Sequence, residues 1–526
     1  MNPPTVTQAQ TWRPEALSEL AQRWDATARR VDDAADAVRT LTEASSEHWA
    51  GHAADAAAGR ARLLAAGAAA RARALISASV AATDGGDQIG RARADLIDTV
   101  ETARREGFTV ADDGSVVHTG AADPALILLA GGNAAAAADM LEVRGAHLQA
   151  RVTEGLQRLA AADADAAADL TAALGAGVTT SPAATVPAGA APSSGADTVL
   201  GWPTMSQDAI AAQIAAMTVQ QRDRLITDFP REVGNTDGVP WSMRIAANRA
   251  NIAAAILAES GADDGSRRRL ALYRDLLAEI DDPNHPGARV RRQILGFDPA
   301  RASLIELHGD LASARSLGVL VPGVNTTIEG SAANTATARR FVTGSHGDVA
   351  MITYLGGPFP QVHDPLAVLL EAADPRSALD MAPRLVAFSE DVERAVGPDV
   401  PVTVIGHSYG GSIVGTAEAL GLTSDRTLFL AAAGAGVGVD DPAEWHNRNP
   451  DVVRYSMTAP GDFIEAVQGI PGGPHGADPD EMPGVITLPA GRYDDGRPVA
   501  GFGAHSGMLN RPSDAWRTIL AVMAGC

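Results

Sequence analysis

The fold of this chain is decided by the stretch Val402-Thr403-Val404-Ile405-Gly406-His407-Ser408-Tyr409-Gly410. Four β-prone residues lead into a G-x-S-x-G motif, and a helix-like stretch, 412–420, follows it. A serine in such a strand-to-helix turn is held in a strained conformation with its hydroxyl exposed. The flanking glycines are needed because a side chain would collide where strand and helix nearly touch. The stretch therefore predicts Ser408 as a nucleophile; the alternative is a glycine-rich turn with an incidental serine.

A serine nucleophile needs a histidine base, which in this kind of site comes last in the chain order serine, acid, histidine. His505 is the predicted base, because it lies after the last predicted strand in a loop that can return to Ser408. His475 is the alternative base; it lies in a turn-rich loop that could instead line the entrance. His446 comes too early in the order, and a solvated loop histidine is the structural alternative.

The acid that orients the base is expected at the carboxyl end of the sheet. Asp462 is the leading candidate, because only a short turn separates it from the preceding predicted strand. Asp440 and Asp441 follow the strand before that one and are the alternative acids. Asp478 and Asp480 are expected in a hydrated acidic loop.

The oxyanion of an acyl-transfer reaction needs two convergent backbone N–H groups. One is expected from Tyr409, which follows the nucleophile. The other is expected from the loop after the strand ending at Val321. Since Pro322 has no N–H, Gly323 or Val324 must donate. An ordinary Pro-Gly turn is the alternative for this loop.

Composition bounds the class of protein. The 526 residues predict two to four domains. The net charge of −22 disfavours nucleic acid and anionic membrane surfaces as partners. The single cysteine, Cys526, excludes an intramolecular disulfide and a cysteine-ligated zinc site. We therefore expect no metal or other cofactor, and a small-molecule acyl or ester substrate.

Residues 13–105 predict two long helices joined at Trp49-Ala50-Gly51, where the tryptophan would cover the open end of the hairpin. A small β-hairpin at 108–117 completes a first domain, 1–120. A helical extension follows over 121–176. Apolar residues three and four apart form a coiled-coil-like seam along the first helix: Leu17, Leu20, Trp24, Ala28, Val31, Ala35, Val38 and Leu41.

This hairpin, with its W-x-G motif, resembles the helical proteins of type VII secretion. A two-helix hairpin buries only one stripe of each helix, so residues 1–176 offer surface to a helical partner. The partner is either the 124–174 region of the same chain, which is favoured because the connection is short, or a second copy, or a small helical protein of the secretion type. The chain departs from the secretion pattern in one respect, since no tyrosine precedes Tyr273 and the usual Tyr-x-x-x-Asp/Glu export signal is absent. Residues 1–12 lack the features of a Sec signal peptide, and no segment is expected to span a membrane. A cytoplasmic location is expected, with type VII export as the alternative.

Residues 177–198, rich in Pro, Ala, Ser and Gly, predict a flexible linker. The remaining domain, 199–526, divides into a helical prefix, 199–290, and an α/β core, 291–526. Helices are expected over 206–226, 241–258 and 267–280, with the first three core strands at an antiparallel edge and the rest parallel. The predicted strands are 293–297, 303–307, 318–321, 349–355, 402–405, 427–431, 452–457 and 485–488.

Residues 200–526 resemble an actinobacterial α/β-hydrolase family whose function is not known. The resemblance implies an α/β-hydrolase fold after an all-α hairpin domain, and a Ser408, Asp462, His505 triad. It implies no particular substrate. The motifs that carry it are Val321-Pro322-Gly323, Gly406 to Gly411, Gly461-Asp462, His505-Ser506-Gly507, and the stretch from Val233-Gly234-Asn235 through Gly238-Val239-Pro240 with Arg244, Ala247 and Asn248.

These observations predict a serine hydrolase that acts on an ester or other acyl substrate, with acyl transfer to another acceptor open. The short gap between residues 431 and 452 leaves no room for a large helical lid, which favours a short acyl group. The alternative is a relict hydrolase fold that serves as a secretion-associated or binding protein.

Overall fold

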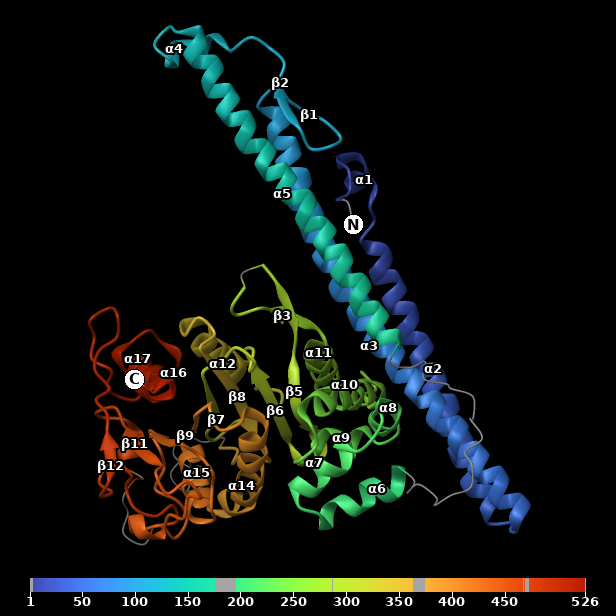
Figure 1. The fold of residues 1–526 in the computed structure, drawn as a ribbon, viewed down its shortest axis with the longest axis vertical. Coiled ribbons are helices and arrows are strands. Elements are labelled where there is room, and N and C mark those ends of the chain that lie inside the picture. Colours follow the sequence, from blue (N-terminus) through green and yellow to red (C-terminus); the bar gives the residue numbers. More distant parts are fainter. Residues whose placement is uncertain are drawn as a thin grey trace. The chain divides into compact units, whose positions relative to one another are not determined.

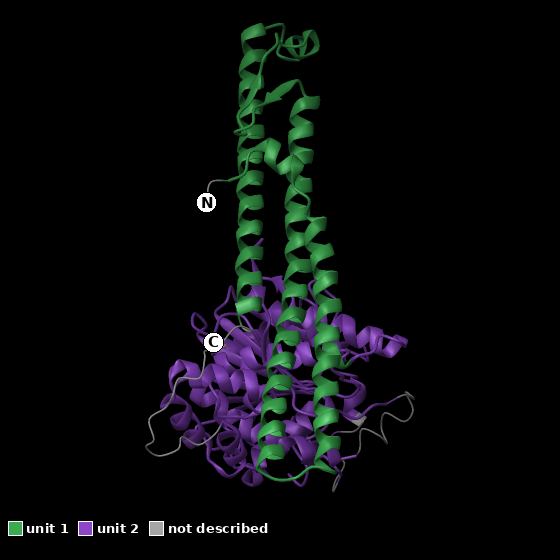
Figure 2. Cartoon of the chain, turned by 90° about the vertical axis from the view of Figure 1, so that its right-hand side faces the viewer, with its two compact units in different colours: residues 1–186, 256–258 green, residues 187–255, 259–526 purple. Residues whose placement is uncertain are grey.

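The chain divides into two compact units, which Figure 2 shows in different colours: residues 1–186 with 256–258, and residues 187–255 with 259–526. The computed structural model describes residues 3–175, 195–285, 287–362, 374–466, 468 and 473–525. Most of the predicted linker, 177–194, lies outside the described residues. Its last four residues, 195–198, are not linker but the start of helix α6 (Gly195–Gly201).

The first unit is built on three long helices: α2 (Glu15–Ser46), α3 (His52–Arg105) and α5 (Ala134–Gly175) (Figure 1). The predicted hairpin is present, and its reversal falls at residues 47–51. In α2 the buried positions are Ala21, Ala28 and Ala35, seven residues apart, as in a coiled-coil seam. The seam prediction is wrong at its far end, because Leu41 is 71% exposed there.

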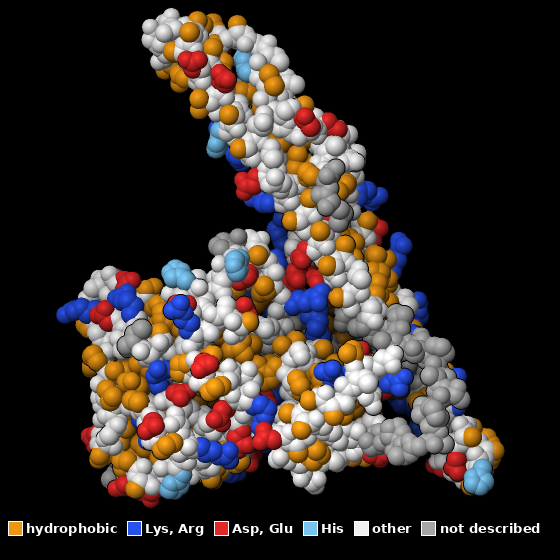
Figure 3. Space-filling view, viewed as in Figure 1, with side chains coloured by type: hydrophobic (Ala, Val, Ile, Leu, Met, Phe, Trp, Pro, Cys, Tyr) orange, Lys and Arg blue, Asp and Glu red, His pale blue; other side chains and the backbone are white. Residues whose placement is uncertain are grey.

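Smaller elements complete this unit: α1 (Val6–Thr11), β1 (Phe108–Val110), β2 (Val116–His118) and α4 (Pro124–Leu129). The predicted β-hairpin is therefore confirmed. Apolar side chains reach the surface at the end of the unit that carries α4 (Figure 3), where Leu128 and Leu129 are exposed. Trp49 is also half exposed, so it does not cover the open end of the α2–α3 hairpin as predicted.

Among the described residues, helix α3 is long and apolar enough to cross a membrane by length and composition alone, which does not overturn the expectation that no segment spans one. Its many alanines raise the mean hydropathy of its most apolar 18-residue window to 1.3, although arginines interrupt the helix. The core helices of soluble proteins pass the same test, and 39% of this window is buried.

The second unit contains, among its described residues, an eight-stranded sheet in the order β12-β11-β10-β9-β7-β8-β6-β5. The pairs from β12 to β8 are parallel, and β8–β6 and β6–β5 are antiparallel. The strands are β5 (Gln293–Asp298), β6 (Ser303–His308), β7 (Ser316–Val321), β8 (Val349–Leu355), β9 (Val402–His407), β10 (Arg426–Leu430), β11 (Val453–Met457) and β12 (Val485–Thr487).

The predicted strand positions agree with this sheet, but one pairing does not. The third core strand, β7, was expected at an antiparallel edge and instead lies in the centre, parallel to both neighbours. Every residue of β7 and β8 is buried, which is the pattern of parallel strands covered on both faces. Each strand could be predicted from its own hydrophobic run. The chain crossover that places β7 between β8 and β9 depends instead on packing of the whole unit.

Helices cover both faces of the sheet (Figure 1). Residues of α12 (Ala332–Gly344) and α17 (Asp514–Ala524) share a core with Leu320 and Ile405. Because side chains alternate along a strand, Gly406 points to the opposite face, against which α15 (Tyr409–Ala419) packs. Helix α14 (Arg376–Val396) packs on α15. This is an α/β-hydrolase fold, and it is preceded by the helical unit, as predicted.

The helical prefix consists of α6, α7 (Gln207–Ala215), α8 (Val219–Asp228), α9 (Pro230–Asn235), α10 (Trp241–Ala258) and α11 (Asp264–Leu277). The helix expected over 206–226 is in fact two, because Thr218 starts α8 with a capping box to Gln221. The predicted C-terminal end of the helix over 267–280 is also wrong, since α11 ends at Leu277. Ile280 lies in the short strand β3 (Glu279–Asp281), which pairs with β4 (Arg289–Arg291).

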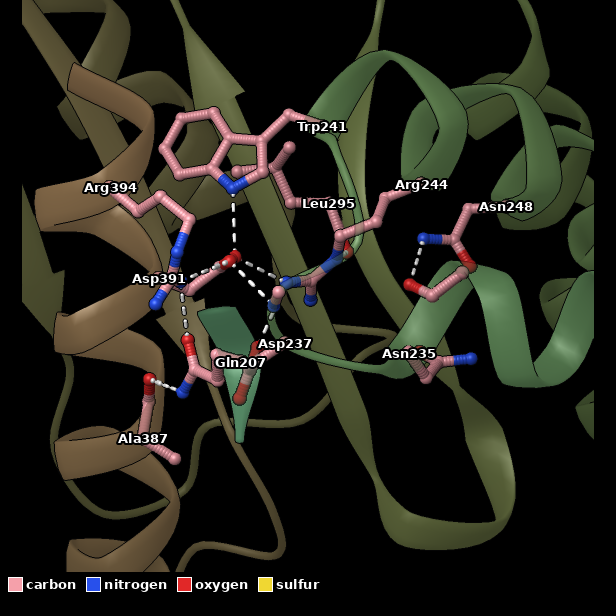
Figure 4. Close-up of polar contacts among 12 residues, drawn as sticks. Gln207, Asn235, Asp237, Trp241, Arg244, Asn248, Leu295, Ala387, Asp391 and Arg394 are labelled. Atoms are coloured by element: carbon pink, nitrogen blue, oxygen red, sulfur yellow. Dashed lines mark hydrogen bonds and ion pairs between the residues drawn. The ribbon is translucent and has the colours of Figure 1, made fainter. Parts of the chain in front are cut away.

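A buried arginine ties the prefix to the core (Figure 4). The Arg244 guanidinium is 1% exposed and donates to the Leu295 carbonyl, to Asp237 Oδ1 at 2.8 Å and to Asp391 Oδ2 at 2.7 Å. Asp391, on α14, also accepts from the Gly238 N–H and from Trp241 Nε1. A buried charge is tolerated only when it is paired and hydrogen-bonded, so this network holds α10 and α14 together.

Replacing Asp391 with alanine should destabilise the second unit by about 3–5 kcal/mol, because the buried Arg244 loses one of its two carboxylate partners and the N–H groups of Gly238 and Trp241 lose their acceptor. Urea unfolding of the full chain measures the change. Asp440→Ala, at an exposed position, is the control and should change stability by less than about 0.5 kcal/mol. A similar small change for Asp391→Ala would contradict the structural role of this network.

Candidate active site

Ser408 stands between β9 and α15 with φ 57° and ψ −124°, a backbone conformation that non-glycine residues rarely adopt. The flanking glycines explain how the chain reaches it. A Cβ on Gly406 would lie 2.7 Å from the carbonyl oxygen of Gly410, and one on Gly410 would lie 2.5 Å from the carbonyl oxygen of Pro322. Strand and helix can therefore meet closely enough to hold Ser408 at the carboxyl edge of the sheet.

The structure brings Asp462 and His505 together. His505 Nδ1 lies 2.9 Å from Asp462 Oδ1 and 3.1 Å from Oδ2. A carboxylate can only accept, so Nδ1 carries the proton and Nε2 is left with a lone pair. Asp462 is 3% exposed and also accepts from the Ile464 N–H, so the orientation of its carboxylate is fixed.

Two backbone contacts position this pair beside the elbow. His407, the last residue of β9, donates from Nε2 to the carbonyl oxygen of His505 at 2.8 Å. The Gly501 N–H donates to the carbonyl oxygen of Pro460, which joins the two loops that carry the pair. His505 was expected in a loop; it lies instead in the first turn of α16 (Ala504–Asn510).

The alternative residues lie elsewhere. His475 is 2% exposed and its Nδ1 lies 2.8 Å from Ser412 Oγ on α15, so it packs behind the elbow and does not line an entrance. His446 is exposed. Asp441 caps the short helix η3 (Pro442–Glu444), and it and Asp440 are both exposed.

The loop after β7 passes directly against the elbow, as an oxyanion-binding loop would. A Cβ on Gly323 would lie 2.7 Å from Ser408 Cβ and 3.0 Å from its Oγ. Asn325, at φ 60°, fixes this loop, because its N–H donates to the Pro360 carbonyl and its Oδ1 accepts from the Val362 N–H. Within the described residues, the N–H groups of Gly323, Val324 and Tyr409 form no hydrogen bond, so all three stay available.

The Tyr409 side chain ties the start of α15 to the start of α14. Its hydroxyl donates to the Asp374 carbonyl at 2.6 Å and accepts from the Ala378 N–H at 3.2 Å. Burial raises the pKa of the Tyr409 hydroxyl to about 12. Only the backbone N–H of this residue is therefore placed to act at Ser408.

Aromatic rings border His505. The Phe463 ring centroid lies 4.4 Å from that of His505 and 4.9 Å from that of Phe502, which is 73% exposed. Ser408 is 5% exposed, and among the described residues its Oγ has no hydrogen-bond partner. Catalytic hydrogen bonds often tighten only when substrate binds, so this geometry is compatible with attack by Ser408. In the described surroundings of Ser408 no cluster of side chains has the spacing of a metal site.

With this geometry in view, the chain can be compared with known proteins. Residues 298–471 match the model of a family described as alpha/beta hydrolase. The match covers the elbow and Asp462 and ends before His505. It begins after the helical hairpin, so the resemblance of that hairpin to type VII secretion proteins stays a prediction. The family match supports assignment of the second unit to the hydrolases.

Two uncharacterized proteins of Mycobacterium tuberculosis, from strains CDC 1551 and H37Rv, are each 26% identical to this chain over 265 residues. The aligned region covers 42% of this chain and 38% of each relative.

Among solved structures, a Pyrobaculum calidifontis esterase is 12% identical, with 47% of this chain and 82% of that chain covered and a TM-score of 0.23. The carboxylesterase EstE1, from a metagenomic library, is 13% identical, with 42% and 83% covered and the same TM-score. Because both TM-scores are low, these structures do not support the fold assignment, which rests on the strand order and the family match.

Gly410→Ala should destabilise the second unit by about 1–3 kcal/mol or more, because the added methyl meets backbone carbonyls that cannot move aside. Gly201→Ala is the matched control, since a Cβ there meets nothing within 4 Å and the backbone is helical. Urea unfolding compares the two variants. Equal stabilities would show that the elbow is less tightly packed than described.

Stability should fall as the pH drops from about 6.5 towards 4, and His407 should contribute to the loss. Burial, and next the nearby His505, lower the pKa of His407 to about 4 from its ordinary 6.5. Between these values the unfolded chain binds a proton that the folded chain does not, so acid favours unfolding by at most about 1.4 kcal/mol per pH unit.

His407→Gln keeps a donor for the His505 carbonyl but cannot titrate, so its stability should depend less on pH in this window. Urea unfolding from pH 4 to 7 gives the slopes, with exposed His446→Gln as control. Parallel curves for wild type and His407→Gln would contradict the prediction.

Proposed function

We propose that this chain is a serine hydrolase that cleaves an ester or other acyl substrate through Ser408, His505 and Asp462. The observation that carries the proposal is the buried Asp462–His505 hydrogen bond, formed beside a serine in a strained elbow. The family match to residues 298–471 supports a hydrolase. The chain spans 38% of the length of its mycobacterial relatives, so the activity of those whole proteins is not carried over.

In the proposed mechanism, His505 Nε2 takes the proton of Ser408 Oγ as the oxygen attacks the acyl carbon. Asp462 accepts a hydrogen bond from Nδ1–H and stabilises the imidazolium that forms. His505 then returns the proton to the leaving group, and an acyl-enzyme remains on Ser408. Water, activated by the same histidine, releases the acyl group and regenerates the serine. An acceptor other than water would make the same site an acyltransferase.

The tetrahedral oxyanion would accept hydrogen bonds from Tyr409 N–H and from Gly323 or Val324 N–H. Each donor of this kind contributes about 3–4 kcal/mol to the stability of the transition state. The close packing of Gly323 on Ser408 supports this assignment, because it brings the loop backbone to the serine. We infer a short acyl group, since residues 431–452 hold only the one-turn helix η3 and no helical lid.

The competing function is that of a relict fold that binds a partner, with residues 1–176 as the binding surface. It differs from the hydrolase in one measurable respect, because a relict site does not acylate. Labelling of the full chain with a fluorophosphonate probe separates the two without knowledge of the substrate. Labelling of wild type and not of Ser408→Ala supports the hydrolase, and no labelling of either supports the relict.

Ser408→Ala and His505→Ala should each lower turnover of p-nitrophenyl acetate by about 10³-fold or more, because each removes a group that acts in the chemical step. Asp462→Asn should cost a comparable factor, since Asp441 is engaged in a helix cap and cannot replace it. Asp440→Asn and His446→Ala are matched controls and should keep wild-type turnover. Wild-type turnover in Ser408→Ala or His505→Ala would refute the assignment.

A further inference from the structure

A polar cleft of ≈ 320 Å³ opens in the second unit between the helical prefix, α14 and the ends of β5, β6 and β8. It is separate from the candidate active site. Ser408 follows β9, and β7 lies between β9 and β8, so the two sites are about 10 Å apart at the usual strand spacing of about 4.8 Å. The polar residues that line it include Asp237, Asp298, Ser303, Tyr354 and Arg384.

The Tyr354 hydroxyl is the first sign that the cleft holds a ligand. The residue is 2% exposed, yet within the described chain its hydroxyl has no hydrogen-bond partner. The equally buried Tyr409 hydroxyl has two. Tyr354 lines the cleft, so its unpaired hydroxyl can both donate to and accept from a molecule bound there. Gly356 lets the chain pass over this hydroxyl, because a Cβ there would collide with it.

Asp237 offers the second free group. Its Oδ1 accepts from Arg244, whereas its Oδ2 has no partner among the described residues, and 25% of the side chain is accessible. Arg244 lies between Asp237 and Asp391 (Figure 4), and this network uses only the Oδ1 oxygen of Asp237. Burial raises the pKa of Asp237, as expected for a carboxylate with one oxygen unpaired.

Charges of both signs line the cleft, which argues against an ionic ligand. Three arginines and two aspartates line it, and Asp237 and Asp298 each pair with one of those arginines. An anion would meet Asp237, and a cation would meet Arg384, whose described hydrogen bond is to the Gly356 carbonyl. A neutral ligand avoids both costs.

The free groups also define the chemistry of that ligand. Asp237 accepts, Arg384 donates and Tyr354 does either, so the ligand must offer donors and acceptors close together, as vicinal hydroxyls do. Ile305 and Pro383 add an apolar wall that suits C–H groups. We propose that this cleft binds a neutral, hydroxyl-rich molecule, a sugar or a polyol, through Asp237, Tyr354 and Arg384.

Saturation-transfer NMR on the full chain tests the proposal, with methyl α-glucoside and glycerol as probes. Transfer to at least one of them is expected in wild type and in Ser408→Ala, since binding does not depend on the proposed catalysis. Tyr354→Phe and Asp237→Asn should each reduce the transfer at least fivefold, whereas Tyr455→Phe, on β11 and outside the cleft, should not. Tetramethylammonium should receive no transfer, and neither it nor inorganic phosphate should displace the probes.

The same variants separate binding from folding. Tyr354→Phe removes an unpaired hydroxyl, so its Tm should equal or exceed that of wild type while binding is lost. The proposal is overturned if neither probe receives transfer, if transfer survives in both cleft variants, or if tetramethylammonium or phosphate displaces the probe. Because Ser408→Ala serves as a binding-competent reference, these outcomes leave the proposed hydrolase function untouched.

Discussion

The close approach of two backbones at Gly410 is the constraint on which the second unit depends. The first turn of α15 lies against the carbonyls of Val321 and Pro322, where no side chain fits. This contact sets the angle at which α15 leaves β9, and it forces Ser408 into its strained conformation. It also brings the loop after β7 to the serine. The position of β7 in the centre of the sheet is therefore a requirement of the site, since an edge strand could not deliver Gly323 there.

The sequence predicted the parts of this structure that are locally encoded. The core strands were found because each is a short hydrophobic run between turns, and the elbow because its glycines have a fixed spacing. Chain order, together with the positions of Asp462 and His505 after predicted strands, paired these two residues, which share a hydrogen bond; their catalytic roles remain proposals. The sequence did not predict that the far end of the α2 seam is exposed. Periodicity shows which face of a helix is apolar, but not how much of that face packs against another element.

What the sequence could not predict depends on residues far apart in the chain. The bond from His407 to the His505 carbonyl spans 98 residues, and the Arg244–Asp391 pair spans 147. Histidine and arginine are ordinary surface residues, so neither sequence position signals a buried partner. The unpaired hydroxyl of Tyr354 could not be predicted either, because a tyrosine in a hydrophobic run indicates core packing.

The bond between His407 and His505 has a consequence for how this scaffold can vary. His407, next to the proposed nucleophile, holds the backbone of the residue proposed as base, so the spacing of these two residues is set at the sheet edge and not by the chain that connects them. The Gly501–Pro460 contact closes the same segment at its base. The exposed turn at 494–498 can thus change in length while the spacing of Asp462 and His505 is kept, whereas β12 and the buried His475 tie other parts of the connecting chain to the sheet and to α15.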